Sequence, residues 1–263
     1  MMMFASDLDR TLIYSNRALM DFPINGEVEL VTVEKKLEKS ISFMTRRSLS
    51  YLQEISAKLL FVPVTTRSLD QFHRVSFPEA SHNYAVTSNG ANILYKGRAL
   101  PEWKEKMTKG LLDSSIHLAD LIALIEHSFH IPGEMREVEK LFFYYYLNEK
   151  VSLQIVQELT DFVEEKGWRV SLQGHKLYFM PAAVSKGEAI RFIQEREGVN
   201  TLIGAGDSIF DDDFLQLCQY PFVLGHGELA RLPLKQNYKV IHKAGANGGE
   251  ELLKSIDELI KKL

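Results

Sequence analysis

The chain begins with a short apolar run that ends at two acidic residues. Residues 1–5 (MMMFA) are typical of a buried strand in a parallel sheet, and Asp7-Leu8-Asp9-Arg10-Thr11 follows almost directly. Open α/β sheets bind ligands at the carboxyl ends of their strands, where these two carboxylates would lie. Two acids this close repel each other unless one is protonated or a cation lies between them, and Mg²⁺ suits oxygen ligands. The motif therefore predicts an α/β fold with a metal-assisted site at a carboxylate.

Bulk properties exclude several classes of protein. The 263 residues carry a formal net charge of −4, which gives no basic excess for binding nucleic acid. The single Cys218 excludes an intrachain disulfide, and its apolar surroundings predict a small buried side chain. The longest apolar stretch, residues 141–147, is too short to cross a bilayer, and the N-terminal run lacks the features of a signal peptide. We expect a cytoplasmic protein with no membrane or nucleic-acid partner.

Strand and helix patterns alternate at the two ends of the chain and change character in the middle. Core strands are predicted at residues 59–64, 84–87, 201–205, 220–224 and 238–241, and core helices at 45–58, 185–197 and 249–262. An early hairpin is predicted from 28–33 and 40–44, with a charged turn over 34–39. A helix over 103–129, a strand over 140–147, a helix over 152–166 and strands over 168–172 and 176–180 form an inserted α+β unit. We expect a core of residues 1–97 and 182–263 enclosing a cap of 98–181.

Three further sites fall at predicted strand ends or helix starts. Thr65 follows the second core strand and could hold a phosphate oxygen, although a turn threonine that caps the next helix is equally consistent. Lys186 opens a helix, where a cation is slightly unfavourable without an anion nearby; a solvated surface lysine is the alternative. Asp207 ends a strand and Asp211 starts a helix, so both could face the same cation. Acidic charge at a helix start explains Asp211 alone, but it does not explain Asp207.

Taken in order, these sites resemble the four motifs of the haloacid dehalogenase (HAD) superfamily. Asp7 and Asp9 match its Asp-x-Asp-x-Thr motif, Thr65 its second motif, Lys186 its third, and Asp207 with Asp211 its fourth. The position of the cap is similar to the C2 type of Cof-like and sucrose-phosphatase-like hydrolases. The resemblance implies a Rossmann-like core with a mainly parallel sheet and an inserted α+β cap.

The resemblance also implies a division of roles. Asp7 would be the nucleophile that forms an aspartyl-phosphate, and Asp9 would be the general acid and base. The Asp7 carboxylate, the Asp9 backbone carbonyl and Asp207 would hold Mg²⁺, with Asp211 a ligand or a neighbour of the ligands. Thr65 and Lys186 would bind the phosphoryl group, and Lys186 would also offset the charge of Asp7.

The substrate is less constrained by the sequence. The resemblance implies a small phosphorylated metabolite, often a sugar phosphate. We expect a monomer or homodimer. The substrate-contact candidates are Thr66, Arg67, Asn89, Gly90, His175 and Lys176. For His175 and Lys176 a plain polar hairpin turn is the simpler interpretation.

The sequence departs from the family pattern in three places. Arg10 stands where the family usually has Gly, so the backbone of the first loop is less certain. Phe210 stands where the Cof-like group usually has Asn. The segment 14–44 is longer than usual and could form either a flap over the site or a solvated edge.

Two other functions share most of these residues. A sugar phosphomutase would use the same core motifs and differ in its product. A non-catalytic phosphometabolite sensor would keep the fold, but it would not need both Asp7 and Asp9. A dehalogenase is disfavoured because halide departure does not need the proton that Asp9 would supply.

Overall fold

The computed structural model describes residues 1–263 and divides into two compact units. The core unit comprises residues 1–99 and 186–263, and the cap unit comprises residues 100–185. None of the helices combines the length and apolar character needed to cross a membrane.

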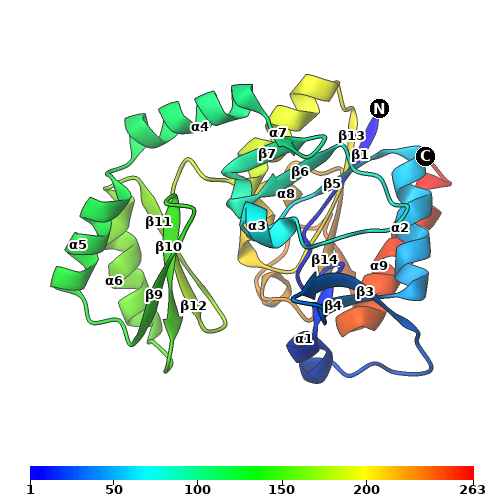
Figure 1. Cartoon of the computed structure of the whole chain (residues 1–263), viewed down its shortest axis with the longest axis horizontal. Coiled ribbons are helices and arrows are strands. Elements are labelled where there is room, and N and C mark those ends of the chain that lie inside the picture. The colour runs from blue at the N-terminus through cyan, green and yellow to red at the C-terminus, as the bar shows by residue number, and fades with distance from the viewer. The chain divides into compact units, whose positions relative to one another are not determined.

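A five-stranded parallel sheet forms the centre of the core unit (Figure 1). Its order is β15-β14-β13-β1-β5, with the bounds Lys239–Ile241, Tyr220–Leu224, Thr201–Gly206, Met2–Ser6 and Leu60–Pro63. β1 pairs in parallel with both β13 and β5, so residues that follow these three strands come together at one edge. A single parallel bridge between Val64 and Val86 continues this sheet toward β6 (Tyr84–Thr87), which pairs with β7 (Asn92–Tyr95) and, beyond it, β8 (Arg98–Ala99).

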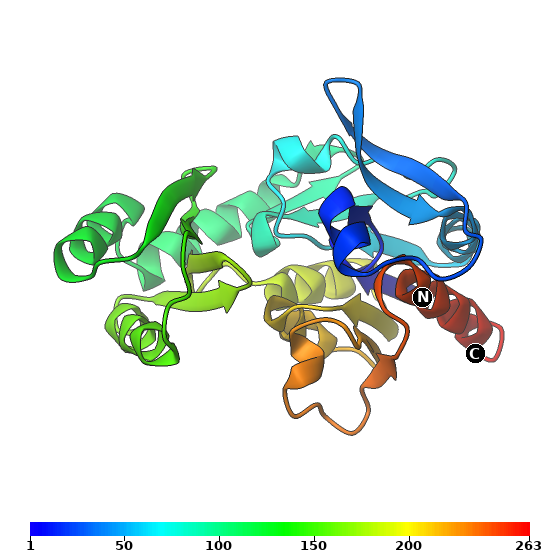
Figure 2. The same cartoon turned by 90° about the horizontal axis from the view of Figure 1, so that it is seen from below.

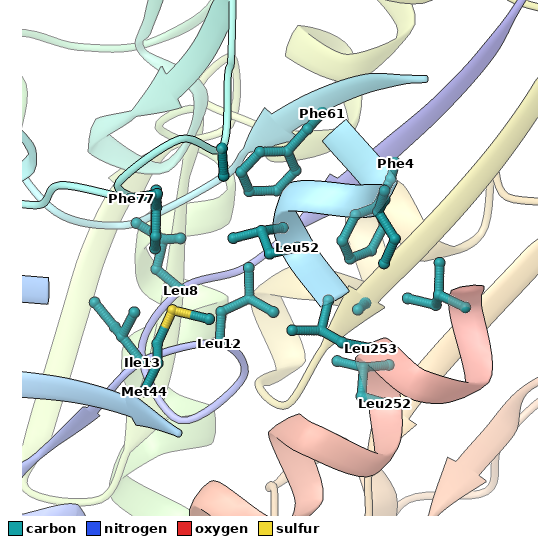
Figure 3. Close-up of a cluster of buried hydrophobic side chains, with 14 of the residues drawn as sticks. Phe4, Leu8, Leu12, Ile13, Met44, Leu52, Phe61, Phe77, Leu252 and Leu253 are labelled. Atoms are coloured by element: carbon teal, nitrogen blue, oxygen red, sulfur yellow. The ribbon is translucent and has the colours of Figure 1, made fainter. Parts of the chain in front are cut away.

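Helices cover both faces of this sheet. On one face α2 (Arg46–Lys58) packs against α9 (Gly245–Ile260), and Leu52 and Leu252 meet Phe4 in the main hydrophobic core (Figure 3). Each such fully buried side chain stabilises the fold by about 1.5–3 kcal/mol. Gly204 faces the other side of β13, against the α8 helix (Asp212–Leu215), which contacts α7 (Lys186–Glu197).

The structure contains the predicted early hairpin, and its two strands extend further toward the turn than the sequence pattern predicts. β3 (Leu30–Lys36) and β4 (Lys39–Thr45) are joined at Leu37 and Glu38, so the expected turn over 34–39 was wrong. β4 also pairs with β2 (Tyr14–Ser15), which leads into the short helix α1 (Asn16–Asp21). Figure 2 shows the hairpin turn projecting from the core unit. Val33 of β3 and Met44 of β4 nevertheless belong to the main hydrophobic core. The segment is therefore not only a solvated edge.

The cap unit contains a four-stranded antiparallel sheet with α5 (Leu118–Ser128) and α6 (Leu153–Glu164) on one face (Figure 1). Its third helix is α4 (Pro101–Ser114), and its strands are β9 (Gly133–Val138), β10 (Phe142–Leu147), β11 (Trp168–Gln173) and β12 (Lys176–Pro181). The predicted single helix over 103–129 is wrong, because the chain leaves the helix at Ser115 and restarts after His117. β9 was not predicted because its sequence, GEMREV, is half charged and has no run of apolar residues. In the structure only Gly133, Met135 and Val138 are partly buried.

Candidate active site

Asp7 and Asp207 lie side by side at the ends of neighbouring strands. β1 and β13 run in register, and the Asp7 backbone N–H donates to the Ala205 carbonyl at 2.9 Å. Both aspartates are buried. The Thr11 hydroxyl donates to Asp207 Oδ1 at 3.5 Å, so the loop after β1 also contacts the second strand end.

Lys186 is the first residue of α7 and is fully buried. Its Nζ donates to Asp7 Oδ1 at 2.9 Å and to Asp211 Oδ1 at 2.5 Å. The alternative of a solvated surface lysine is therefore wrong. An ammonium removed from water in this way needs paired carboxylates, and these two supply them.

Both carboxylate oxygens of Asp211 accept hydrogen bonds, Oδ1 from Lys186 and Oδ2 from the start of the turn that contains Asp211. It ends a one-turn 3₁₀ helix, Ile209–Asp211, and its Oδ2 accepts from the backbone N–H groups of Asp207 and Ser208 at 3.0 and 2.8 Å. The Ser208 hydroxyl donates to the same oxygen at 3.0 Å. Gly206 makes this approach possible, because a Cβ there would lie 2.4 Å from Asp211 Cβ.

The carboxylates form a buried acidic cluster. Asp7, Asp207 and Asp211 each offer an oxygen, and these oxygens lie within 4.8 Å of one another. Burial raises the pKa of Asp7 to about 7, with the nearby charges of Asp211 and Asp9 adding to the effect and Lys186 opposing it. Burial, followed by the charge of Asp7, also raises the pKa of Asp207 well above its usual value.

This cluster fits a divalent metal ion. Burial lowers the pKa of Lys186, but the carboxylates of Asp211 and Asp7 raise it by more, so its single positive charge stays in place. One ammonium cannot balance three carboxylates, and the donors are all oxygen, which hard divalent cations prefer. The residues present can therefore hold such an ion between Asp7 and Asp207.

Thr65 and Arg67 follow β5, directly beside the end of β1. Val64 N–H donates to the Ser6 carbonyl at 2.7 Å, and the buried Thr65 hydroxyl accepts from the Arg67 backbone N–H at 3.1 Å. The Arg67 side chain holds Asp9 with two hydrogen bonds, Nε to Oδ2 at 2.6 Å and Nη2 to Oδ1 at 2.8 Å. Asp9 is the most open of these acids, with 45% of its side chain exposed.

The other predicted contact residues fall into two groups. Thr66 is half-buried in the same loop, while Asn89 and Gly90 are buried in the turn after β6, where Asn89 N–H donates to the Thr65 carbonyl at 3.0 Å. His175 and Lys176 belong to the cap unit, at the turn between β11 and β12. His175 is exposed and stacks on Tyr146, and Lys176 lies over the ring of Tyr144.

Arg10 adopts the left-handed backbone that a glycine would adopt freely. Its φ is 67°, and its N–H donates to the Ile13 carbonyl at 2.9 Å. The Arg10 side chain pairs with Asp21 at 3.0 Å and lies over the ring of Phe22. These contacts offset the strain that a non-glycine residue carries in this conformation.

Two residues near the site were missed from the sequence. His226 Nε2 hydrogen-bonds the Arg10 carbonyl at 2.9 Å, and Glu34 forms an ion pair with Arg67 at 2.8 Å. Glu34 lies in a charged run that reads as a turn, and His226 lies in an irregular loop. No local pattern marks either residue, because each contact joins segments that are far apart in the chain.

The family profile of sucrose-6F-phosphate phosphohydrolases matches residues 1–246. The chain belongs to this family. It is therefore a phosphoric monoester hydrolase of the HAD superfamily. No curated protein sequence matches the chain.

Solved structures share the fold of this family member at low sequence identity. The sucrose-phosphatase of Synechocystis sp. PCC6803, solved with sucrose and phosphate, is 14% identical, with 97% of this chain and 98% of that chain covered and a TM-score of 0.70. A haloacid dehalogenase-like hydrolase from Bacillus subtilis is 18% identical over 97% of this chain and 91% of that chain, with a TM-score of 0.55. A trehalose-6-phosphate phosphatase related protein is 18% identical, with both chains fully covered and a TM-score of 0.55.

Proposed function

We propose that this protein is a Mg²⁺-dependent phosphatase that hydrolyses a small phosphorylated metabolite, most specifically a sugar phosphate, through an aspartyl-phosphate. The observation that carries the proposal is the buried ammonium of Lys186 between Asp7 and Asp211, with Asp207 beside them. The family description and the names of two structural relatives, which act on or relate to sugar phosphates, support the substrate class.

The first half-reaction uses Asp7 as the nucleophile. A carboxylate oxygen of Asp7 attacks phosphorus and forms the new P–O bond, while the bond from phosphorus to the substrate oxygen breaks. Asp9, as the carboxylic acid, gives its proton to the departing oxygen, which leaves as an alcohol. Lys186 orients Asp7 through Oδ1 and offsets negative charge at the phosphoryl group.

The second half-reaction uses water. Asp9, now ionised, takes a proton from the water that attacks phosphorus, and the bond to Asp7 breaks to release inorganic phosphate. Thr65, at the end of β5, supplies a hydroxyl for a phosphoryl oxygen. Asp7, the Asp9 backbone carbonyl and Asp207 would hold Mg²⁺, with Asp211 beside them, and the ion neutralises charge on the transferred group when bound.

The test is phosphate release by the purified protein from a panel of sugar phosphates and p-nitrophenyl phosphate, with Mg²⁺ and with EDTA. We expect Mg²⁺-dependent release that Asp7→Asn abolishes. Asp161→Asn, on an exposed position of α6, is the matched control and should keep full activity. Absence of release by folded, Mg²⁺-loaded protein would contradict the proposal, and an isomerised sugar phosphate as product would replace it with a phosphomutase.

A further inference from the structure

A chain of ion pairs joins the β3–β4 hairpin to Asp9. The Arg67 guanidinium gives Nε and Nη2 to the two oxygens of Asp9, at 2.6 and 2.8 Å. Its third nitrogen, Nη1, lies 2.8 Å from Glu34 Oε2. One rigid fork therefore spans from the inserted hairpin to the carboxylate that follows β1.

Glu34 is almost completely buried, with 1% of its side chain accessible, although it belongs to a hairpin whose turn projects from the core unit. The pairing of β3 with β4 shifts register on both sides of Glu34, and Glu34 also bridges to Val75. Such a bulge re-aims a side chain, and here the consecutive residues Val33 and Glu34 are both buried.

The Glu34 carboxylate is fully engaged where it lies. Ser42 donates to Oε2 at 2.6 Å, and Arg74 lies 3.2 Å from Oε1. Burying a carboxylate is costly unless such partners compensate for the lost water. The bulge and Ser42 of the hairpin, together with Arg74, therefore fix one acidic group next to Arg67.

The backbone of Arg67 is fixed as well. Its N–H donates to the Thr65 hydroxyl at 3.1 Å, and its carbonyl accepts from Ser88 N–H at 2.7 Å. Glu34 binds Nη1 of the Arg67 guanidinium. The other two nitrogens, Nε and Nη2, then point toward Asp9. The orientation of Asp9 is therefore set by Arg67 and, behind it, by Glu34.

We propose that Arg67, anchored by Glu34, is a positioning residue that sets the orientation of Asp9 for proton transfer to the leaving group. The inference rests on the proposed phosphatase function. Proton transfer uses one oxygen of Asp9, so one hydrogen bond to Arg67 opens in that step and the other keeps the carboxyl group in place. The hairpin then acts in catalysis through Glu34, at a distance from the reacting atoms.

Two aryl phosphates of similar shape separate this role from a general structural one. Phenolate leaves poorly without a proton, whereas p-nitrophenolate leaves readily, so phenyl phosphate depends more on a well-placed Asp9. Misplacing a catalytic group by about 1 Å can cost on the order of 10²-fold in rate. For Glu34→Gln we expect kcat on phenyl phosphate to fall about 10- to 100-fold, kcat on p-nitrophenyl phosphate to fall less than about threefold, and KM to change little for both.

Matched variants complete the experiment. Glu29→Gln removes an exposed glutamate just before the same hairpin, paired only with Arg46 here, and should leave both rates unchanged. Arg67→Lys keeps the charge but not the fork, so it should reproduce the selective loss on phenyl phosphate and test the inference if Glu34→Gln folds poorly. Equal losses on both substrates, or no loss on either, would overturn the positioning role.

Crystal structures of the wild type and Glu34→Gln give a readout that needs no turnover. We expect Asp9 in one orientation against Arg67 in the wild type, and displaced or in two orientations in the variant. An unchanged Asp9 in Glu34→Gln would refute the inference even if the wild type proved inactive on every phosphate ester. Inactivity of the wild type on all esters would instead refute the phosphatase proposal.

Discussion

Lys186 Nζ lies 2.9 Å from Asp7 Oδ1, and both side chains are buried. The two residues are 179 positions apart in the sequence. They meet because the C-terminal end of β1 and the N-terminal end of α7 lie at the same edge of the sheet. This contact joins the two segments of the core unit at the proposed nucleophile.

Replacing Lys186 by methionine should destabilise the metal-free protein. The change keeps an unbranched side chain of nearly the same length but leaves Asp7 and Asp211 buried without their cation, which costs about 3–5 kcal/mol. Mg²⁺ should restore part of this loss, while phosphatase activity should fall by roughly 10²-fold or more. Urea unfolding with EDTA and with Mg²⁺ measures the effect, and Lys254→Met on an exposed face of α9 is the control. A stability equal to that of the wild type would contradict the pairing.

The raised pKa of Asp7 predicts how stability depends on pH. The folded value of about 7 exceeds the ordinary 3.8, so protonated Asp7 adds stability below its ordinary pKa, and this contribution is lost as pH rises through about 7. Asp7→Asn imitates the protonated form and keeps that contribution. In EDTA, the Tm of Asp7→Asn should therefore rise relative to the wild type between about pH 5 and about pH 8. A constant difference between the two proteins over this range would contradict the shift.

Gly206→Ala should disturb the acidic cluster directly. The added methyl would lie 2.4 Å from Asp211 Cβ and 2.6 Å from its Cγ, so Asp211 must leave the position in which it pairs with Lys186. We expect a loss of about 1–3 kcal/mol in stability, together with weaker Mg²⁺ binding by calorimetry. Gly110→Ala within α4 is the matched control, since its Cβ would meet Ala183 at 3.4 Å and alanine is the better helix former by about 1 kcal/mol. If Gly206→Ala bound Mg²⁺ as the wild type does, the close approach would be unimportant.

Arg10 allows a comparison that isolates backbone strain. Arg10→Gly and Arg10→Ala both lose the contacts with Asp21 and Phe22, but only glycine adopts φ = 67° without a Cβ penalty. We expect the glycine variant to be more stable than the alanine variant by about 1 kcal/mol. Denaturant midpoints of the two variants decide the matter, and an alanine variant of equal or greater stability would mean that the loop relaxes out of the left-handed region.

The strands of the central sheet and the helices beside them could be predicted from local sequence patterns, whereas β2, β7, β8 and β9 could not. The run before Asp7 became β1, Thr45 caps α2 through Ser48 N–H as its pattern predicts, and residues 220–224 form β14. Such elements are readable because they depend on neighbouring residues: alternation, apolar runs and caps act over a few positions. The same local reading failed over 103–129, where the apolar pattern continues through the break at Ser115–His117.

Which charged side chains meet depends on the tertiary fold and not on local sequence. Burial of Lys186 between Asp7 and Asp211, the hold of Arg67 on Asp9, and the inward turn of Glu34 each depend on segments distant in the sequence. A lysine or glutamate is exposed in most settings, and its burial becomes favourable only when folding brings an opposite charge within hydrogen-bonding distance. That energy belongs to the pair rather than to either residue, so the composition and spacing around Glu34 carry no sign of it.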